Sequence, residues 1–215
     1  MPESEENQGR GRPRWMTLLT VLMLLVGGRF LMTSASDLYR VATGKAEVLS
    51  LDGTLDAQQE MLLRGQVVLG NALARHRPVS LSVHAVTRLG LGLVYLFAVA
   101  AIFSGDKRGR RAALLAGFAG IVASVGNVLF LEVVVRRMLP WLAPMLAHAL
   151  AQDAVRAGRS ALAPDAVAEQ ARLFLVDVPM VVTSMGVLWS LLLIAYFRGR
   201  RVRLFYNQPR QADHV

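Results

Sequence analysis

The chain has 215 residues, of which 54% are hydrophobic and only 18% are charged, whereas roughly 25% of residues are charged in an average soluble domain. Its net charge is nevertheless +9, so the basic residues must be segregated from the apolar ones. This combination predicts an integral membrane protein. The absence of cysteine excludes disulfides, thiolate metal sites and iron–sulfur clusters.

Four apolar runs are long enough to be membrane spans. A hydrocarbon core of about 30 Å needs about 20 apolar residues in a helix that rises about 1.5 Å per residue. The runs predict spans at about 15–36, 83–105, 112–135 and 178–197. They leave an N-terminal arm (1–14), long connections (37–82 and 136–177) and a basic tail (198–215). The expected fold is all-α, an integral membrane four-helix bundle with helical extracytoplasmic connections.

The first run, Met16 to Ser36, carries a single charge, Arg29. A secretory signal is the alternative interpretation, because the apolar stretch Met16 to Gly28 precedes the small residues Ser34-Ala35-Ser36, which resemble a cleavage site. Cleavage would leave three spans and the same sidedness of the loops.

The first long connection predicts a helix. Asp52-Gly53 marks a turn, and Asp56 followed by Gln59 resembles a capping box. An apolar stripe then continues to Arg75-His76-Arg77, where Pro78 ends the helix.

The third run has a one-sided distribution of small residues. At 100° per residue, one face collects the predicted packing residues Ala116, Gly120, Ser124 and Asn127, and the opposite face carries Leu115, Phe118 and Val122. Small residues let helix backbones approach closely in a membrane, so we expect the first face to meet protein. The candidate partners are Gly27 and Gly28 in the first run and Gly90 and Gly92 in the second.

The second long connection contains a fifth uncharged stretch, Met138 to Gln152, with Pro140 and Pro144 inside it. Its length and its prolines favour an interfacial or re-entrant helix over a span. We expect a helix over about 141–156 and another that begins at Pro164.

The distribution of basic residues predicts the orientation. The arm, the turn after the second run and the tail together hold twelve Lys and Arg against five Asp and Glu, whereas the two long connections hold ten against nine. The positive-inside rule therefore places both termini in the cytoplasm and predicts an inner, plasma-membrane location. The tail residues expected to attract anionic headgroups are Arg198, Arg200, Arg201 and Arg203.

A few ionisable residues fall inside or near the outer ends of the runs. They form the candidate intramembrane polar cluster: Arg29, His84, Arg88, Glu132 and Asp177. Such groups pair with one another, snorkel to the headgroups or line a wet cavity. The hypothesis is an outward-opening vestibule where the arginines meet Asp177 and Glu132. Structural ion pairing, snorkelling and a substrate or ion site all remain open as interpretations.

No motif defines a reaction or a cofactor. The chain contains no HExxH, GxSxG or phosphate-loop pattern, and its four histidines lack metal-ligand spacing, so we expect no catalytic residues, metal or cofactor. The expected function is that of a non-catalytic accessory, scaffold or assembly subunit of a membrane complex. The alternatives are a small transporter or channel subunit and an integral membrane enzyme acting on a lipid or quinone. The expected partners are membrane lipids and other membrane subunits or further copies of the chain, and nucleic acid is not expected.

Overall fold

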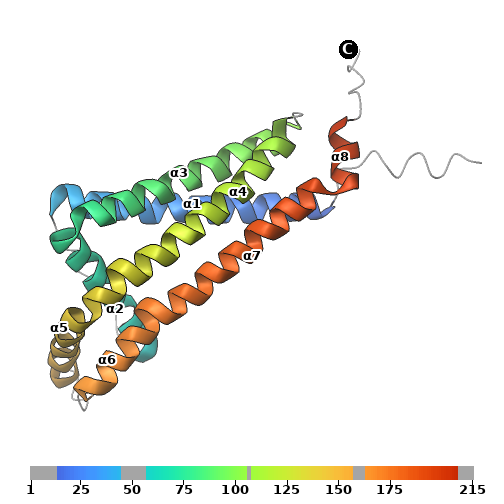
Figure 1. The fold of residues 1–215 in the computed structure, drawn as a ribbon. Helices are drawn as coiled ribbons and strands as arrows, with labels where there is room; N and C mark the ends of the chain where they lie inside the picture. The colour runs from blue at the N-terminus through green and yellow to red at the C-terminus, as the bar shows by residue number, and fades with distance from the viewer. Residues whose placement is uncertain (1–13, 45–56, 106–107, 157–162, 208–215) are drawn as a thin grey trace, which may run out of the picture. The chain divides into compact units, whose positions relative to one another are not determined.

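The structure, a computed structural model, describes residues 14–44, 57–105, 108–156 and 163–207. Regular structure in these ranges is entirely helical (Figure 1). The elements are α1 (Arg14–Thr43), α2 (Ala57–His76), α3 (Pro78–Phe103), α4 (Arg108–Phe130), the π-helical turn η2 (Leu131–Val135), α5 (Arg136–Arg156), α6 (Pro164–Arg172), the π-helical turn η3 (Leu173–Asp177), α7 (Val178–Arg198) and α8 (Arg200–Asn207). The prediction of an all-α fold is confirmed.

Four helical runs are long and apolar enough to cross a membrane. They are Arg14–Thr43, Pro78–Phe103, Arg108–His148 and Asp165–Arg198. Helices suit this solvent because hydrocarbon offers no partner for a backbone N–H or C=O, so each must be bonded within its own segment. The chain is therefore a membrane-integral helical protein, and the expected number of four apolar helices is confirmed. The interpretation of the first run as a retained span, with a cleaved signal as the alternative, stays a prediction.

The chain divides into two compact units. The first unit comprises Met1–Met32, Arg88–Ala123 and Gly186–Val215, and the second comprises Thr33–Thr87 and Ser124–Met185. Parts of α1, α3, α4 and α7 belong to each. Each unit has its own apolar core.

The core of the first unit draws on all four long helices and on α8. Its largest fully buried side chains are Met16 and Met23 of α1, Tyr95 and Ile102 of α3, and Leu193 and Phe197 of α7. From α4 come the small residues Ala112, Ala113 and Ala116. Large side chains on three helices therefore fill the space that small side chains on the fourth leave open.

Glycines mark the closest approaches between helices of the first unit. A Cβ built on Gly92 would lie 3.0 Å from the carbonyl oxygen of Gly27, so α1 and α3 meet backbone to backbone. A Cβ on Gly117 would lie 2.7 Å from Ile194, and one on Gly120 would meet the Ser190 hydroxyl. The small-residue face of α4 thus packs on α7, whereas Gly27 and Gly92 contact each other.

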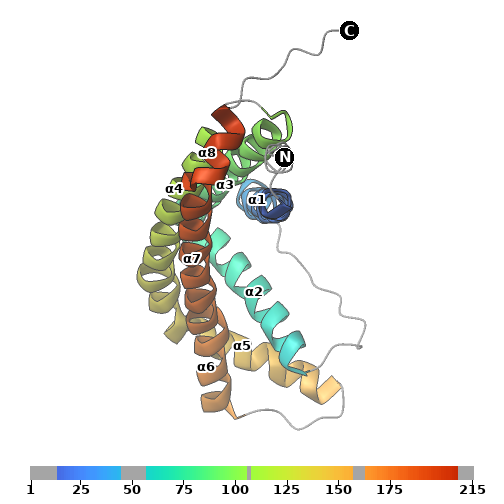
Figure 2. The ribbon, with the colours of Figure 1, turned by 90° about the vertical axis from the view of Figure 1, so that its right-hand side faces the viewer.

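The second unit is built around α5. Leu142 and Leu146 are buried in its two apolar clusters, with α6 and η3 contributing Val167 and Leu175, and α2 contributing Leu73. Figures 1 and 2 show that α5 runs across the direction of α6, and these two helices are in contact. The interpretation of α5 as an interfacial or re-entrant helix stays a prediction.

Prolines begin two of the helices. Pro78 follows the last residue of α2 by two positions and is the first residue of α3, and Pro164 is the first residue of α6. Proline suits this position because its missing N–H would have no partner within the helix. The predicted start at Pro164 is confirmed. The predicted turn at Asp52-Gly53 and the capping residue Asp56 lie outside the described residues.

Replacing Gly109 with alanine is expected to destabilise the protein. The new Cβ would lie 2.6 Å from the carbonyl oxygen of Ala101 and 2.9 Å from the Tyr206 hydroxyl, and a backbone oxygen cannot swing away. Overpacking of this kind typically costs about 1–3 kcal/mol. Unfolding in mixed detergent micelles, followed by tryptophan fluorescence, measures the loss.

Gly90→Ala is the matched control, because nothing lies within 4 Å of the Cβ it would add to α3. Alanine is favoured over glycine in a helix by roughly 0.5–1 kcal/mol, so Gly90→Ala should be neutral or slightly stabilising. Equal stability of the Gly109 and Gly90 variants would contradict the close approach of α3 and α4.

Candidate functional site

Two π-helical turns in the second unit carry the two carboxylates that the sequence singles out. Glu132 lies in η2, between α4 and α5, and Asp177 ends η3, between α6 and α7. The two turns contact each other. Single π-helical turns inside α-helices are uncommon and often occur at functional sites, so this pair of turns is a candidate site.

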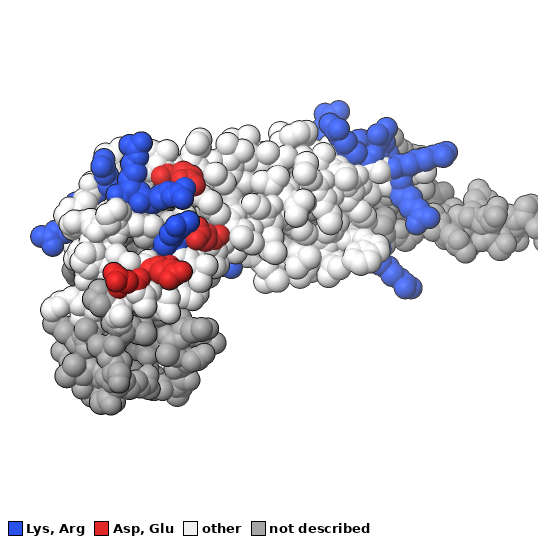
Figure 3. All heavy atoms as spheres, turned by 60° about the horizontal axis from the view of Figure 1, so that its bottom comes forward, with Lys and Arg blue, Asp and Glu red and all other residues white. Residues whose placement is uncertain are grey.

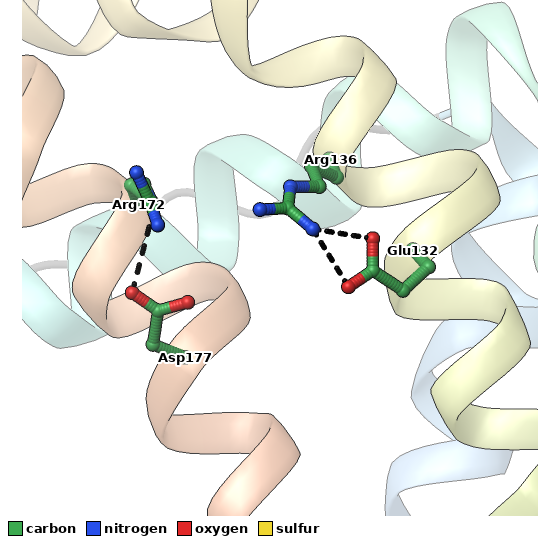
Figure 4. A network of polar contacts seen from close by, with 4 residues as sticks. All are labelled: Glu132, Arg136, Arg172 and Asp177. Carbon is green, nitrogen blue, oxygen red and sulfur yellow. Dashed lines mark hydrogen bonds and ion pairs between the residues drawn. The ribbon is translucent and has the colours of Figure 1, made fainter.

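Each carboxylate is held by an arginine (Figure 4). One terminal nitrogen of Arg136 donates to both oxygens of Glu132, at 2.8 and 2.7 Å. The Nε atom of Arg172 lies 3.6 Å from a carboxylate oxygen of Asp177. In the close-up, Arg136 lies between the two acids. Its guanidinium group is therefore also attracted by the negative charge of Asp177. The four groups form one neutral network.

The π-helical geometry explains the second pair. Arg172 and Asp177 are five residues apart, and an α-helix would place them on different faces. A π-helix bonds residue i to residue i+5, which brings this spacing onto one side. Glu132 and Arg136 have the ordinary i, i+4 spacing, with the acid on the N-terminal side, the better order for a helical ion pair.

Both pairs are open to the surroundings. The exposed fraction of the four side chains runs from 37% for Glu132 to 60% for Arg172. An exposed ion pair is worth little in stability. The effect of the network is to neutralise four charges at the place where the turns η2 and η3 touch.

The other members of the predicted polar cluster lie in different surroundings. His84, in the second unit, stacks face to face on Phe130, with ring centroids 4.1 Å apart. Arg29 and Arg88 belong to the first unit, so their meeting with the carboxylates of the second unit stays a prediction. Arg136 and Arg172, which sequence reasoning did not place in the cluster, are the observed partners of its acids.

Asn127 links two helices of the second unit. Its side-chain amide donates to the hydroxyl of Thr183, on α7. The same hydroxyl donates to the carbonyl oxygen of Pro179, one turn earlier. Ser124, the other polar residue of the predicted packing face, is half-buried. An amide to hydroxyl bond of this kind ties α4 to α7.

A second polar group lies inside the first unit. Tyr95 is 1% exposed, and its hydroxyl is placed beside the side chains of Ser190 and Trp189. The Ser190 hydroxyl donates to the carbonyl oxygen of Gly186 at 2.9 Å. Gly120 makes this possible, because a Cβ there would lie 3.0 Å from the Tyr95 oxygen. Sequence reasoning did not bring Tyr95 and Ser190 together.

These arrangements offer little for catalysis. A hydroxyl becomes a nucleophile only beside a general base, and Tyr95 and Ser190 have hydroxyl and indole neighbours. The two carboxylates are engaged by guanidinium groups. In the four described ranges, no three His, Asp or Glu side chains come together as a metal-binding group would require. The geometry supports packing and charge neutralisation.

Most basic residues of the first unit lie at the start of α4, at the end of α7 and on α8, and they gather at one end of the unit (Figure 3). Two of them bond backbone carbonyls there: Arg110 donates from Nε to Phe197 at 2.9 Å, and Arg203 donates from Nε to Arg198 at 2.9 Å. These bonds satisfy carbonyls at the C-terminal end of α7, where a cation is favourable. Arg198 lies over the ring of Phe118, 5.9 Å from its centroid. Arg200 and Arg201, on α8, are exposed.

No family model, no curated protein and no solved structure matches this chain in the three comparisons made.

The Asn127 to Thr183 bond is expected to contribute a measurable coupling energy. In a cycle of Asn127→Ala, Thr183→Val and the double variant, the coupling should be about 0.6 kcal/mol, the average for polar bonds between membrane helices. Unfolding in mixed micelles measures it. Ser184→Ala is the control, because the exposed Ser184 hydroxyl bonds Met180 on its own helix. When Asn127→Ala is combined with Ser184→Ala, the two losses in unfolding free energy should add. A coupling energy as large as that between Asn127 and Thr183 would contradict a specific bond between those two residues.

Proposed function

We propose that the chain is a non-catalytic scaffold or assembly subunit of a membrane complex. The observation that carries this proposal is the filled interior of the first unit. Tyr95, Phe197 and Leu193 are essentially inaccessible, and apolar side chains from α1, α3, α4 and α7 close around them. A core filled in this way leaves little room for a wet path through the described part of the first unit, which favours a scaffold over a transporter.

The polar groups of the second unit support the same function. Glu132 and Asp177 are paired with Arg136 and Arg172 in a neutral, exposed network. A site for proton transfer or for a charged substrate needs a group that is available to it. The transporter and enzyme alternatives therefore draw less support from the geometry than the scaffold does.

The contact surface that we propose for a partner subunit is the exposed face of α5. Trp141 and Met145 are one turn apart and almost half exposed, whereas Leu142 and Leu146, about 100° further round the helix, are buried. The Trp141 ring is steadied by an edge contact with His76, at 4.5 Å between centroids. Tryptophan and methionine are enriched in protein interfaces. A rigid aromatic side chain on the exposed face of α5 suits a contact with a partner subunit.

We also propose a bacterial-type inner membrane with both termini in the cytoplasm. The support is the charge of the first unit: its described residues include no Asp or Glu, and arginines crowd around the start of α4 and the end of α7. Positive charge next to spans favours the cytoplasmic side. Other membrane subunits or further copies of the chain, and anionic lipids at this side, are the partners that follow from this placement.

The assembly function predicts a complex that depends on α5. In mild detergent, the chain should migrate on a native gel well above the size of a single chain, and Trp141→Ala with Met145→Ala should return it to that size. Val122→Ala with Leu115→Ala is the control, since both residues are exposed on α4 of the first unit. A chain that migrates alone before any substitution would refute the proposal.

The orientation can be tested by labelling, because the natural sequence contains no cysteine. A membrane-impermeant maleimide should modify Glu169→Cys on α6 in intact spheroplasts. It should modify Arg201→Cys on α8 only after the membrane is permeabilised. Both positions are exposed in the structure. The opposite pattern would place the termini outside the cytoplasm.

A further inference from the structure

Three exposed arginines flank the aromatic contact between α2 and α5. Arg75 and Arg77 are the sequence neighbours of His76, whose ring meets the ring of Trp141 at 4.5 Å between centroids. Arg137 lies on α5, one turn before Trp141. None of the three arginines forms an ion pair or a side-chain hydrogen bond with the residues that the structure describes. We call these three arginines the basic group.

Two exposed acids lie on α6. Asp165 and Glu169 are four residues apart, so their side chains are neighbours on one stripe of the helix. The opposite side of α6 is buried, where Val167 and Ala171 pack into an apolar core. Across the described ranges, neither acid pairs with a basic side chain. We call Asp165 and Glu169 the acidic group.

Both groups belong to the second unit. They also lie in the predicted connections 37–82 and 136–177, which are expected on the same side of the membrane. The basic group and the acidic group of one chain do not pair with each other. Two copies in the same membrane therefore present opposite charges to each other on the same side.

A two-fold symmetric pair of chains would use these charges efficiently. In such a pair both copies contribute the same surface, so that each contact occurs twice. The half-exposed side chains of Trp141 and Met145 supply an apolar part next to the basic group. An apolar centre with tryptophan and arginine, surrounded by a polar rim, is typical of protein interfaces.

We propose that this surface binds a second copy of the chain, with the basic group of each copy (Arg75, Arg77 and Arg137) facing the acidic group (Asp165 and Glu169) of the other. Charge complementarity selects this occupant. An anionic lipid headgroup would pair with the arginines and leave both acids without a partner. The inference rests on the proposed scaffold function, because it names the partner of the exposed α5 face.

The test uses two full-length copies with different affinity tags, co-expressed in one membrane and solubilised in a mild detergent. The amount of the second copy recovered with the first measures self-association. Arg75→Glu with Arg77→Glu in both copies should lower this recovery at least about fivefold, because like charges across an interface repel. Asp165→Lys with Glu169→Lys in both copies should lower it for the same reason.

The two variants should rescue each other when they are mixed. If one copy carries the reversed arginines and the other the reversed acids, every reversed charge again faces an opposite charge. Recovery should then return to at least about half of the parent value, which would also show that both variants fold. A mixed pair recovered no better than either variant with itself would overturn the proposal.

Salt tests the same contact without any substitution. Raising the ionic strength from 0.1 M to 1 M shortens the Debye length from about 10 Å to about 3 Å, so the recovery of the parent copies should fall. This measurement decides the matter if the variants do not fold. Recovery of the parent that is unchanged by salt would overturn the proposal.

Arg200→Glu with Arg201→Glu is the charge-matched control for the arginine variant. Both residues are exposed on α8 and belong to the first unit, outside the proposed surface. Recovery should be the same as for the parent. Equal losses for the two arginine pairs would overturn the proposal in favour of a general effect of net charge.

Other occupants give different results in these experiments. A loss with the reversed arginines but not with the reversed acids would indicate an anionic lipid and would overturn the proposal. Tagged parent copies that do not co-purify, although the native gel shows a complex, would indicate a different subunit. In that case this inference fails and the scaffold function stands, whereas a chain that migrates alone on the native gel refutes both.

Discussion

The constraint on which this structure depends is that helices in hydrocarbon gain little from apolar burial against one another. Lipid tails are as apolar as leucine, so association relies on close packing and on a few polar bonds. The first unit meets this requirement through glycine: Gly27 and Gly92 bring α1 and α3 together, and Gly117 and Gly120 bring α4 against α7. A bulky side chain at these positions would separate the backbones. Large residues such as Tyr95 and Phe197 then fill the remaining volume.

Charged groups follow a second rule, which is that each must find a partner or reach a polar surface. In the second unit, Glu132 and Asp177 pair with arginines at the π-helical turns, and the spacing of Arg172 and Asp177 depends on such a turn. The first unit, in its described ranges, has arginines without acids. The described residues of the second unit therefore carry charges of both signs, whereas those of the first unit carry only positive ones.

The fold class was accessible from the sequence because hydropathy and helix length are local properties. The face of α4 that packs was also readable, since a 3.6-residue period sorts Ala116 and Gly120 from Leu115 and Val122 without any knowledge of the neighbours. The identity of the neighbour was not readable. Gly120 lies against Ser190 and Tyr95, whereas the glycines expected as its partners, Gly27 and Gly92, lie against each other. Any apolar helix that carries small residues could pack on this face of α4. The neighbour is therefore decided by how well the whole helix surfaces fit together.

The sequence by itself determined four apolar helices, the segregation of charge to their ends and the start of α6 at a proline, because each follows from residues close together in the chain. The tertiary structure decided which groups meet. It paired Glu132 with Arg136 and Asp177 with Arg172, and it stacked His84 on Phe130. Such contacts depend on the rotation of one helix about its axis relative to another. That rotation is set by the fit of whole surfaces, which no local pattern encodes.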